Sequence, residues 1–216
     1  MHPKLTLKTF ALGPWQTNCY VIESTQSTMK DCWIIDAGYD PQPMLQFIQA
    51  SGLSPVKVIL THAHLDHIAG LHEVRRLWPK VPILIHEMER DFLAEPELNL
   101  SAMMDEPVVA PPADELLKHG QNLELYGQIF EIRHTPGHSP GGITLYQPLL
   151  KTALVGDTLF ARSIGRYDFP TSDGPTLMQS IRDQLLTLPD DTAVLPGHGP
   201  ATTIGNERKY NPYLRE

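Results

Sequence analysis

Short apolar runs bounded by turn residues recur along the chain and predict two groups of β-strands. Three runs occupy the first 40 residues and are separated by Gly-Pro and Ser/Thr-rich turns, and the pattern returns after residue 122. The predicted strands are Leu5–Leu12, Cys19–Glu23, Cys32–Ala37, Val56–Leu60, Pro82–Ile85, Leu123–Tyr126, Gln128–His134, Ile143–Tyr146, Thr152–Val155 and Ala193–Leu195.

Apolar residues at helical spacing predict helices after several of these strands. One short helix follows Pro43, a second runs from His67 to Pro79, and a short acidic helix follows Ile85. Two more are predicted at 175–186 and 204–210, whereas residues 96–114 show no clear period. Because strands followed by a helix occur in both halves, the pattern predicts an α/β (α+β) fold of two sheets packed face to face with helices outside.

The composition and charge of the chain limit its expected number of domains, its partners and its location. The 216 residues are 41% apolar and 19% charged, which predicts one domain, 1–216, with a substantial core. A net charge of -8 argues against a nucleic acid or anionic membrane as partner. No run approaches the ~18 apolar residues of a spanning helix, and residues 1–8 lack a secretory apolar core, so we expect a cytoplasmic protein. Cys19 and Cys32 are predicted to be buried free thiols.

The chemistry of the chain centres on residues 61–67, Thr-His-Ala-His-Leu-Asp-His, at the end of an apolar run. Neutral imidazole and carboxylate are ligands that zinc, iron and manganese accept, and catalytic sites keep one coordination position open. A surface histidine patch or a purely structural metal site is the alternative explanation. The density of ligands predicts a metal site.

Three later strands also end in turns that carry a candidate ligand: His138, Asp157 and His198, each beside glycine. Seven candidate ligands exceed the need of one tetrahedral ion and suit two divalent ions. Residues two apart in an extended loop point the same way, which assigns His62 and His64, with His138, to one ion. The second ion would take Asp66, His67 and His198, and Asp157 would bridge.

The HxHxDH run and the later His, Asp and His occur in the order found in the metallo-β-lactamase superfamily, which the chain resembles over nearly its whole length. The resemblance implies a four-layer αββα sandwich and the same two ligand sets. Three segments, 156–160, 164–170 and 196–214, resemble glyoxalase II-like hydrolases. The nearest match is the single-domain bacterial form, and we expect no separate C-terminal glutathione-binding helical domain of the kind that the two-domain enzyme carries.

This resemblance implies hydrolysis of S-D-lactoylglutathione or a related 2-hydroxyacyl thioester, as in methylglyoxal detoxification. Two ions lower the pKa of a shared water toward ~7 and polarise the carbonyl, and Asp66 would orient that water and accept its proton. Arg166 matches a cationic position that helps hold glutathione. Zinc is the metal expected first, with iron or manganese as alternatives. Gly142 stands where many members have a second His, which is expected to alter the surroundings of the metal set and not the set itself.

Other interpretations remain open. Persulfide dioxygenases resemble the pattern too, but they bind one iron and use oxygen on glutathione persulfide. A β-lactamase is expected to be secreted, and the sequence does not support a secreted location. A nuclease is expected to have a basic surface, and the sequence does not predict one. The lone histidines His86 and His134 are expected near the site or on the surface, and His2, His72 and His119 in solvent. Trp15, Trp33 and Trp78 are expected in or near the core.

Overall fold

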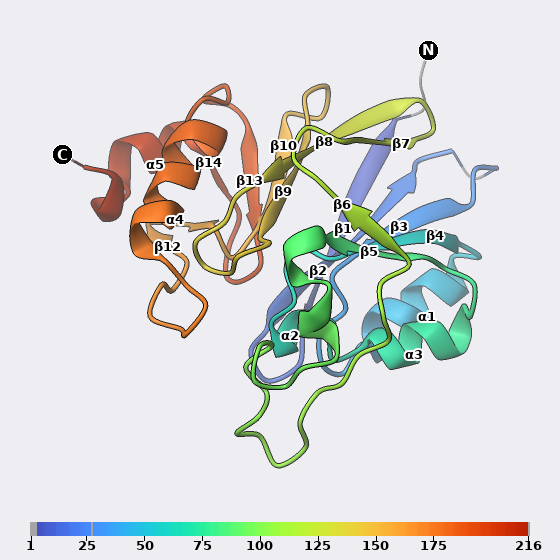
Figure 1. Ribbon diagram of the computed structural model, residues 1–216. Coiled ribbons are helices and arrows are strands. Elements are labelled where there is room, and N and C mark those ends of the chain that lie inside the picture. The colour runs from blue at the N-terminus through green and yellow to red at the C-terminus, as the bar shows by residue number, and fades with distance from the viewer. Residues whose placement is uncertain (1–3, 27, 216) are drawn as a thin grey trace.

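The strands pair into two six-stranded mixed sheets that face each other, with helices on the outer faces (Figure 1). The computed structural model describes residues 4–26 and 28–215. This arrangement confirms the predicted layer order. His2 lies outside the described residues.

The first sheet has the order β1-β2-β3-β4-β5-β6. Strands β1 to β3 are antiparallel, and β3 to β6 are parallel. The strands are β1 (Leu5–Leu12), β2 (Thr17–Ser24), β3 (Asp31–Ile35), β4 (Ser54–Ile59), β5 (Ile83–His86) and β6 (Glu115–Leu117).

The second sheet has the order β14-β13-β10-β9-β8-β7, in which only the β10–β13 pair is parallel among the described strands. A hairpin of β11 (Leu159–Phe160) and β12 (Ser163–Ile164) lies beside it. The strands of the sheet are β7 (Asn122–Leu125), β8 (Gln128–His134), β9 (Ile143–Gln147), β10 (Thr152–Gly156), β13 (Ala193–Pro196) and β14 (Thr202–Thr203).

The helices lie on the outer faces of the sheets, α1 and α3 on the first and α4 and α5 on the second (Figure 1). Short 3-10 turns occur at Glu87–Glu89, Asp91–Leu93 and Pro212–Leu214. The helices are α1 (Gln42–Ala50), α2 (Leu65–Ile68), α3 (Leu71–Leu77), α4 (Gly174–Ser180), a π-helical turn (Ile181–Leu185) and α5 (Ile204–Tyr210). In the described part of the chain, no helix has the length and apolarity to span a bilayer.

Alternating side chains of each strand reach different cores. In β2, Tyr20 and Ile22 point between the sheets, whereas Cys19 and Val21 point toward α1 and α3. This period of two is what a strand covered on both faces requires. Trp33 of β3 meets Phe130 of β8 across the interface, with ring centroids 5.0 Å apart. Packing of the two sheets therefore sets how their strand ends meet.

Several predictions about the elements need correction. The helix predicted from His67 to Pro79 divides into α2 and α3, because Gly70 N–H donates to Ala37 O at 2.8 Å and the backbone turns there. The single helix predicted at 175–186 changes to a π-helical turn after Ser180. Strand β6 and the two-residue strands β11, β12 and β14 were not predicted, because such short segments carry no recognisable period. Residues 96–114 contain no helix or strand.

Candidate metal centre

Seven polar side chains meet at one end of the two sheets, where strands from both halves finish. His62, His64, Asp66 and His67 follow β4, on the loop and first turn of α2. His138 follows β8, Asp157 follows β10 and His198 follows β13. Because each side chain leaves the carboxyl end of a strand in a short loop, the sheet packing brings together residues up to 136 positions apart, from His62 to His198.

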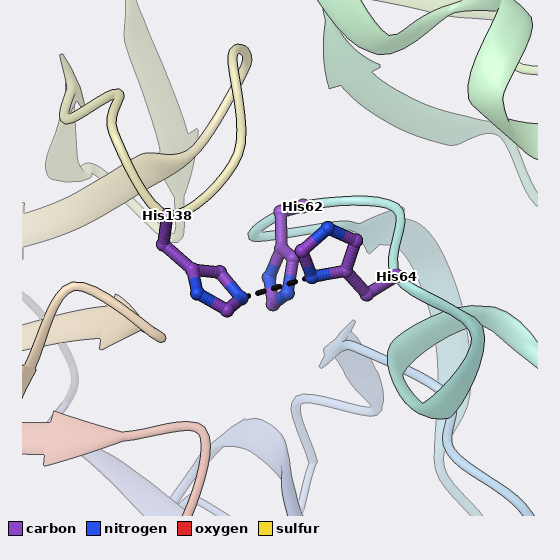
Figure 2. Close-up of side chains that lie close together, drawn as sticks. All are labelled: His62, His64 and His138. Carbon is purple, nitrogen blue, oxygen red and sulfur yellow. Dashed lines mark hydrogen bonds between the residues drawn. The ribbon is translucent and has the colours of Figure 1, made fainter. Parts of the chain in front are cut away.

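The first cluster consists of His62, His64 and His138. Figure 2 shows His138 reaching from its own loop toward the two imidazoles on the loop after β4. His64 Nδ1 lies 2.9 Å from His138 Nε2, and one nitrogen from each of the three rings fits within a 4.8 Å span. All three residues are buried. This is the predicted first ligand set.

The second cluster consists of Asp66, His67 and His198. His198 Nε2 lies 3.1 Å from Asp66 Oδ2, and His67 Nε2 lies 3.5 Å from the same oxygen. Asp157 lies between the clusters: its Oδ2 is 3.5 Å from His138 Nε2 and also 3.5 Å from His198 Nε2. Asp157, predicted to bridge two ions, thus lies within 3.5 Å of a histidine from each cluster.

Several of these ligand atoms are buried and make no hydrogen bond to any described residue. They are His62 Nε2, His64 Nε2, His67 Nε2 and Asp157 Oδ1. A buried polar atom without a partner costs about 1–3 kcal/mol, so four of them in and between the two clusters indicate that these atoms serve as metal ligands. The donor set of imidazole nitrogen and carboxylate oxygen fits two divalent ions.

Hydrogen bonds to the far side of the His67 and His138 rings set their tautomers. His67 Nδ1–H donates to Asp36 Oδ2 at 2.8 Å, and Asp36 also accepts from Thr61 N and Thr61 Oγ1, both at 2.7 Å. His138 Nδ1–H donates to the carbonyl of Arg166 at 2.8 Å. Each bond leaves the lone pair of Nε2 directed at the cluster, as a metal ligand requires.

His198 is oriented in the same way by the opposite half of the molecule. Its Nδ1–H donates to the carbonyl of Trp15 at 3.1 Å. Strand β2 holds the loop itself, because Asn18 Nδ2 donates to the carbonyls of Pro196 and Gly199, at 3.0 and 2.9 Å, and Tyr20 Oη donates to that of Pro196 at 2.7 Å. These contacts join the two sheets directly at the site.

The electrostatics of the site favour bound cations. Burial lowers the pKa of His62 and His138 and that of His64 to about 3, so these rings are neutral near pH 7. Burial by itself would raise the pKa of Asp66 and Asp157, but the charge of His67 together with the hydrogen bonds and charges of the other neighbouring groups outweighs it, and both pKa values are lowered. The imidazoles of the first cluster and the two carboxylates are therefore in the protonation state that a metal needs.

In the second cluster the imidazoles compensate the negative charge. Burial opposes protonation of His67, yet the neighbouring carboxylates of Asp66, Asp36 and Asp157 raise its pKa well above the usual value. Burial likewise opposes protonation of His198, whose pKa is raised by the hydrogen bond to Asp66. Three carboxylates around two imidazoles concentrate negative charge that a divalent ion would neutralise.

Glu89 is a buried carboxylate that sequence reasoning missed. It is 0% exposed. Its Oε2 accepts from Ala63 N at 2.6 Å and its Oε1 from Gly141 N at 2.8 Å. It thereby joins the loop of His62 and His64 to the loop of His138. Within its Glu-Met-Glu turn, nothing in the sequence distinguished Glu89 from an exposed acid.

Asp36 and Thr17 were also missed. Asp36 has a positive φ of 60° and is 1% exposed, and Thr17 Oγ1 donates to Asp66 Oδ2 at 2.7 Å. An acidic residue directly after an apolar strand, in the segment Ile34-Ile35-Asp36-Ala37-Gly38, was the available signal for Asp36. No comparable signal marked Thr17.

A cavity of about 480 Å³ opens beside the two clusters. Arg166 lies on its lining, but its guanidinium is paired with Asp168 through two contacts of 2.9 and 3.0 Å. Asp168 engages Nε and Nη2 of Arg166 and not Nη1, so an anionic group would share the guanidinium with Asp168. Trp15 also lines the cavity and is 42% exposed, so its expected core location is wrong; Trp33 is buried and Trp78 packs against the first core, as predicted.

The remaining histidines and cysteines mostly follow the predictions. His86 and His134 stack with ring centroids 4.0 Å apart, and His134 Nε2–H donates to the carbonyl of Pro140 at 2.9 Å, so both support the His138 loop. His72 contacts the carbonyl of Val109 and His119 accepts from the backbone of His134, so neither is simply solvated. Both cysteines are buried free thiols.

At Gly142 a Cβ would lie 3.0 Å from the carbonyl of Thr135. The backbone there approaches the start of the His138 loop closely. Gly142 therefore borders the loop without belonging to either ligand cluster.

Comparison with known proteins adds independent findings. Residues 12–198 match the profile described as "Metallo-beta-lactamase superfamily". The chain is 40% identical over 204 residues to "Probable metallo-hydrolase YqgX" of Bacillus subtilis, with 94% of each chain covered. It is 35% identical over 212 residues to "Hydroxyacylglutathione hydrolase GloC" of Haemophilus influenzae, covering 97% of this chain and 98% of that one.

Two solved structures have similar folds. One is the BLEG-1 B3 metallo-beta-lactamase, at a TM-score of 0.92 and 38% identity, covering 98% of this chain and 100% of that one. The other is TTHA1623 in a di-iron-bound form, at a TM-score of 0.84 and 35% identity, covering 96% of this chain and 100% of that one.

Proposed function

This chain belongs to the metallo-hydrolases of the metallo-β-lactamase superfamily, and we propose that it cleaves S-D-lactoylglutathione or a related 2-hydroxyacyl thioester. The observation that carries the proposal is the convergence of seven His and Asp side chains, four of which have a buried ligand atom that makes no hydrogen bond to any described residue. The seven are His62, His64, Asp66, His67, His138, Asp157 and His198.

The proposed ligand sets are those of the two clusters, with Asp157 shared. Two divalent ions bound there would acidify a water and polarise the substrate carbonyl. Zinc is proposed first because structural and catalytic zinc sites use this donor set, while iron is the metal in the TTHA1623 structure. Metal analysis distinguishes the two.

Asp66 is the proposed catalytic base. Its Oδ2 accepts from Thr17 and faces His198 Nε2, so the carboxylate is held at the edge of the cavity. Its lowered pKa keeps it ionised and able to orient a water by accepting a hydrogen bond. The residues of the chain therefore supply binding and orientation of the nucleophile.

A thioester suits this site because its thiolate leaving group needs little protonation, the pKa of a thiol being about 8–9. No proton donor is then required on the leaving-group side. The GloC relative supports the thioester class. The proposal treats residues 1–216 as one domain and places the reaction in the cytoplasm, where glutathione keeps thiols such as Cys19 and Cys32 reduced.

The test is hydrolysis of S-D-lactoylglutathione by purified, metal-analysed protein, followed by release of free thiol. Asp66→Asn controls for contaminating activity, and Asp191→Asn, an exposed acid paired with Lys151, is the matched control. We expect about two metals per chain and turnover that is lost in Asp66→Asn and kept in Asp191→Asn.

Absence of turnover on S-D-lactoylglutathione and on other 2-hydroxyacyl thioesters in a fully metallated sample refutes the proposal. Oxygen uptake with glutathione persulfide, at one iron per chain, would instead identify a dioxygenase. Both assays use the same sample, so the two activities are compared directly.

A further inference from the structure

Thr17 is a buried residue at the start of β2 that contacts two ligands of the second cluster. Its hydroxyl donates to Asp66 Oδ2 at 2.7 Å, and its backbone forms an isolated β-bridge with His198. The residue is 1% exposed. Because threonine is branched at Cβ, its χ1 angle is restricted. Asp66 therefore receives a hydrogen bond from a donor whose position is fixed.

The two carboxylate oxygens of Asp66 have different surroundings. Oδ2, which accepts from Thr17, lies 3.1 Å from His198 Nε2 and 3.5 Å from His67 Nε2, so it is the oxygen that faces the second cluster. No described residue donates a hydrogen bond to Oδ1, and Oδ1 is not one of the buried side-chain atoms that lack a partner. Oδ1 is therefore accessible from the cavity that Asp66 lines. The hydrogen bond from Thr17 selects which oxygen faces the cluster.

The turn between β1 and β2, which precedes Thr17, orients a second ligand. The carbonyl of Trp15 accepts from His198 Nδ1–H at 3.1 Å. The turn is held by Gln16, which has φ of 52° and whose side-chain and backbone N–H groups both donate to the carbonyl of Gly13, at 2.8 and 3.2 Å. With Thr17, this turn orients two of the three ligands of the second cluster.

The first cluster is held by different groups. His138 donates to the carbonyl of Arg166, and Glu89 joins the loop of His138 to the loop after β4. None of these hydrogen bonds comes from residues 13–17. A change at Thr17 should therefore act on the second ion and leave the first nearly unaffected.

We propose that Thr17 is a positioning residue for the second metal ion, because its hydroxyl keeps Asp66 Oδ2 directed at His67 and His198. The inference rests on the two-ion site of the proposed function and not on its substrate. Groups that orient a metal ligand commonly change metal affinity by about 10- to 100-fold when they are removed. Thr17 should have an effect in this range.

The experiment measures zinc affinity by competition with a chelator. Thr17→Val keeps a similar shape and removes the hydroxyl, whereas Thr17→Ser keeps the hydroxyl. Each change is made in two backgrounds: His64→Ala, which disables the first cluster, and His198→Ala, which disables the second. Thr152→Val is the matched control, because Thr152 is also buried and its hydroxyl donates to the carbonyl of Leu150 at 2.9 Å. Circular dichroism verifies that each variant is folded.

With the first cluster disabled, Thr17→Val should lower zinc affinity about tenfold, and Thr17→Ser should retain most of the affinity. With the second cluster disabled, both changes should leave the affinity within about twofold, as for independent sites. Thr152→Val should behave as its parent in both backgrounds. Selectivity for one cluster and rescue by serine separate positioning from a general loss of stability, which would weaken both sites.

Four results would overturn the inference: unchanged affinity of Thr17→Val with the first cluster disabled, equal weakening in both backgrounds, equal loss in Thr17→Ser, or tighter binding by Thr17→Val. Tighter binding would show that the hydroxyl competes with the ion for Asp66 Oδ2. Selective weakening in a protein that hydrolyses no thioester would refute the proposed reaction and leave the role of Thr17 standing. Turnover by the wild type with unchanged affinity of Thr17→Val would do the reverse.

Discussion

Replacement of Glu89 by Gln should loosen the contact between the two ligand loops. One carboxylate oxygen becomes an amide NH₂, and that group then faces a backbone N–H, of Ala63 or of Gly141, that it cannot accept from. A buried N–H without an acceptor costs about 1–3 kcal/mol. We therefore expect Glu89→Gln to lower the free energy of unfolding by about 1–3 kcal/mol.

The same change should weaken binding of the first ion. Ala63 lies between His62 and His64, and Gly141 lies three residues after His138, so the lost bond separates ligands of one cluster. A loss of 1.4 kcal/mol corresponds to about tenfold in affinity, and we expect about that weakening. Urea unfolding of the metal-free protein gives the stability, and competition with a chelator gives the affinity.

Glu87→Gln is the matched control, because Glu87 belongs to the same 3-10 turn but is exposed and paired with Lys118. It should behave as wild type in both assays. Glu89→Gln with unchanged stability and unchanged metal affinity would refute the role of Glu89. Reduced stability with unchanged metal affinity would show that Glu89 supports the fold without positioning the ligands.

Three further outcomes are expected. Asp36→Asn removes the negative charge that orients His67 and should lower the affinity for the second ion about 10- to 100-fold. Calorimetric zinc titration measures this affinity, and unchanged affinity at both sites would contradict the prediction. Burial and His134 lower the pKa of His86 to about 4 from 6.5, so the folded state binds fewer protons than the unfolded one between those values and stability falls as the pH is lowered through that range. His86→Phe, studied metal-free by urea unfolding, should show a shallower pH dependence there, and an unaltered slope would argue against it. Gly197→Ala would place a Cβ 2.1 Å from Asp157 Oδ1; we expect fewer than two metals per chain by elemental analysis with the circular dichroism spectrum retained, and full metal content would show that the site can adjust.

Much of the fold follows from local pattern. Strands such as Leu5–Leu12 and Gln128–His134 have their predicted bounds because a short run containing apolar residues between turn residues is recognised from near neighbours alone. The break between α2 and α3 cannot be predicted from the local pattern, since the helical period of Ile68, Leu71 and Val74 continues across it. There the backbone N–H of Gly70 bonds to Ala37, a residue on another strand end.

The same division applies to the site. The sequence alone determined which side chains are candidate ligands, because the HxHxDH run and the glycine-flanked His138, Asp157 and His198 are local features. The tertiary structure decided how they meet, that Glu89 and Asp36 hold them, that Arg166 is paired with Asp168, and that Trp15 lines a cavity instead of the core. In the turn Glu87–Glu89, the neighbours in sequence do not distinguish the buried carboxylate of Glu89 from the exposed one of Glu87. Only the packing of the two sheets removes the side chain of Glu89 from water.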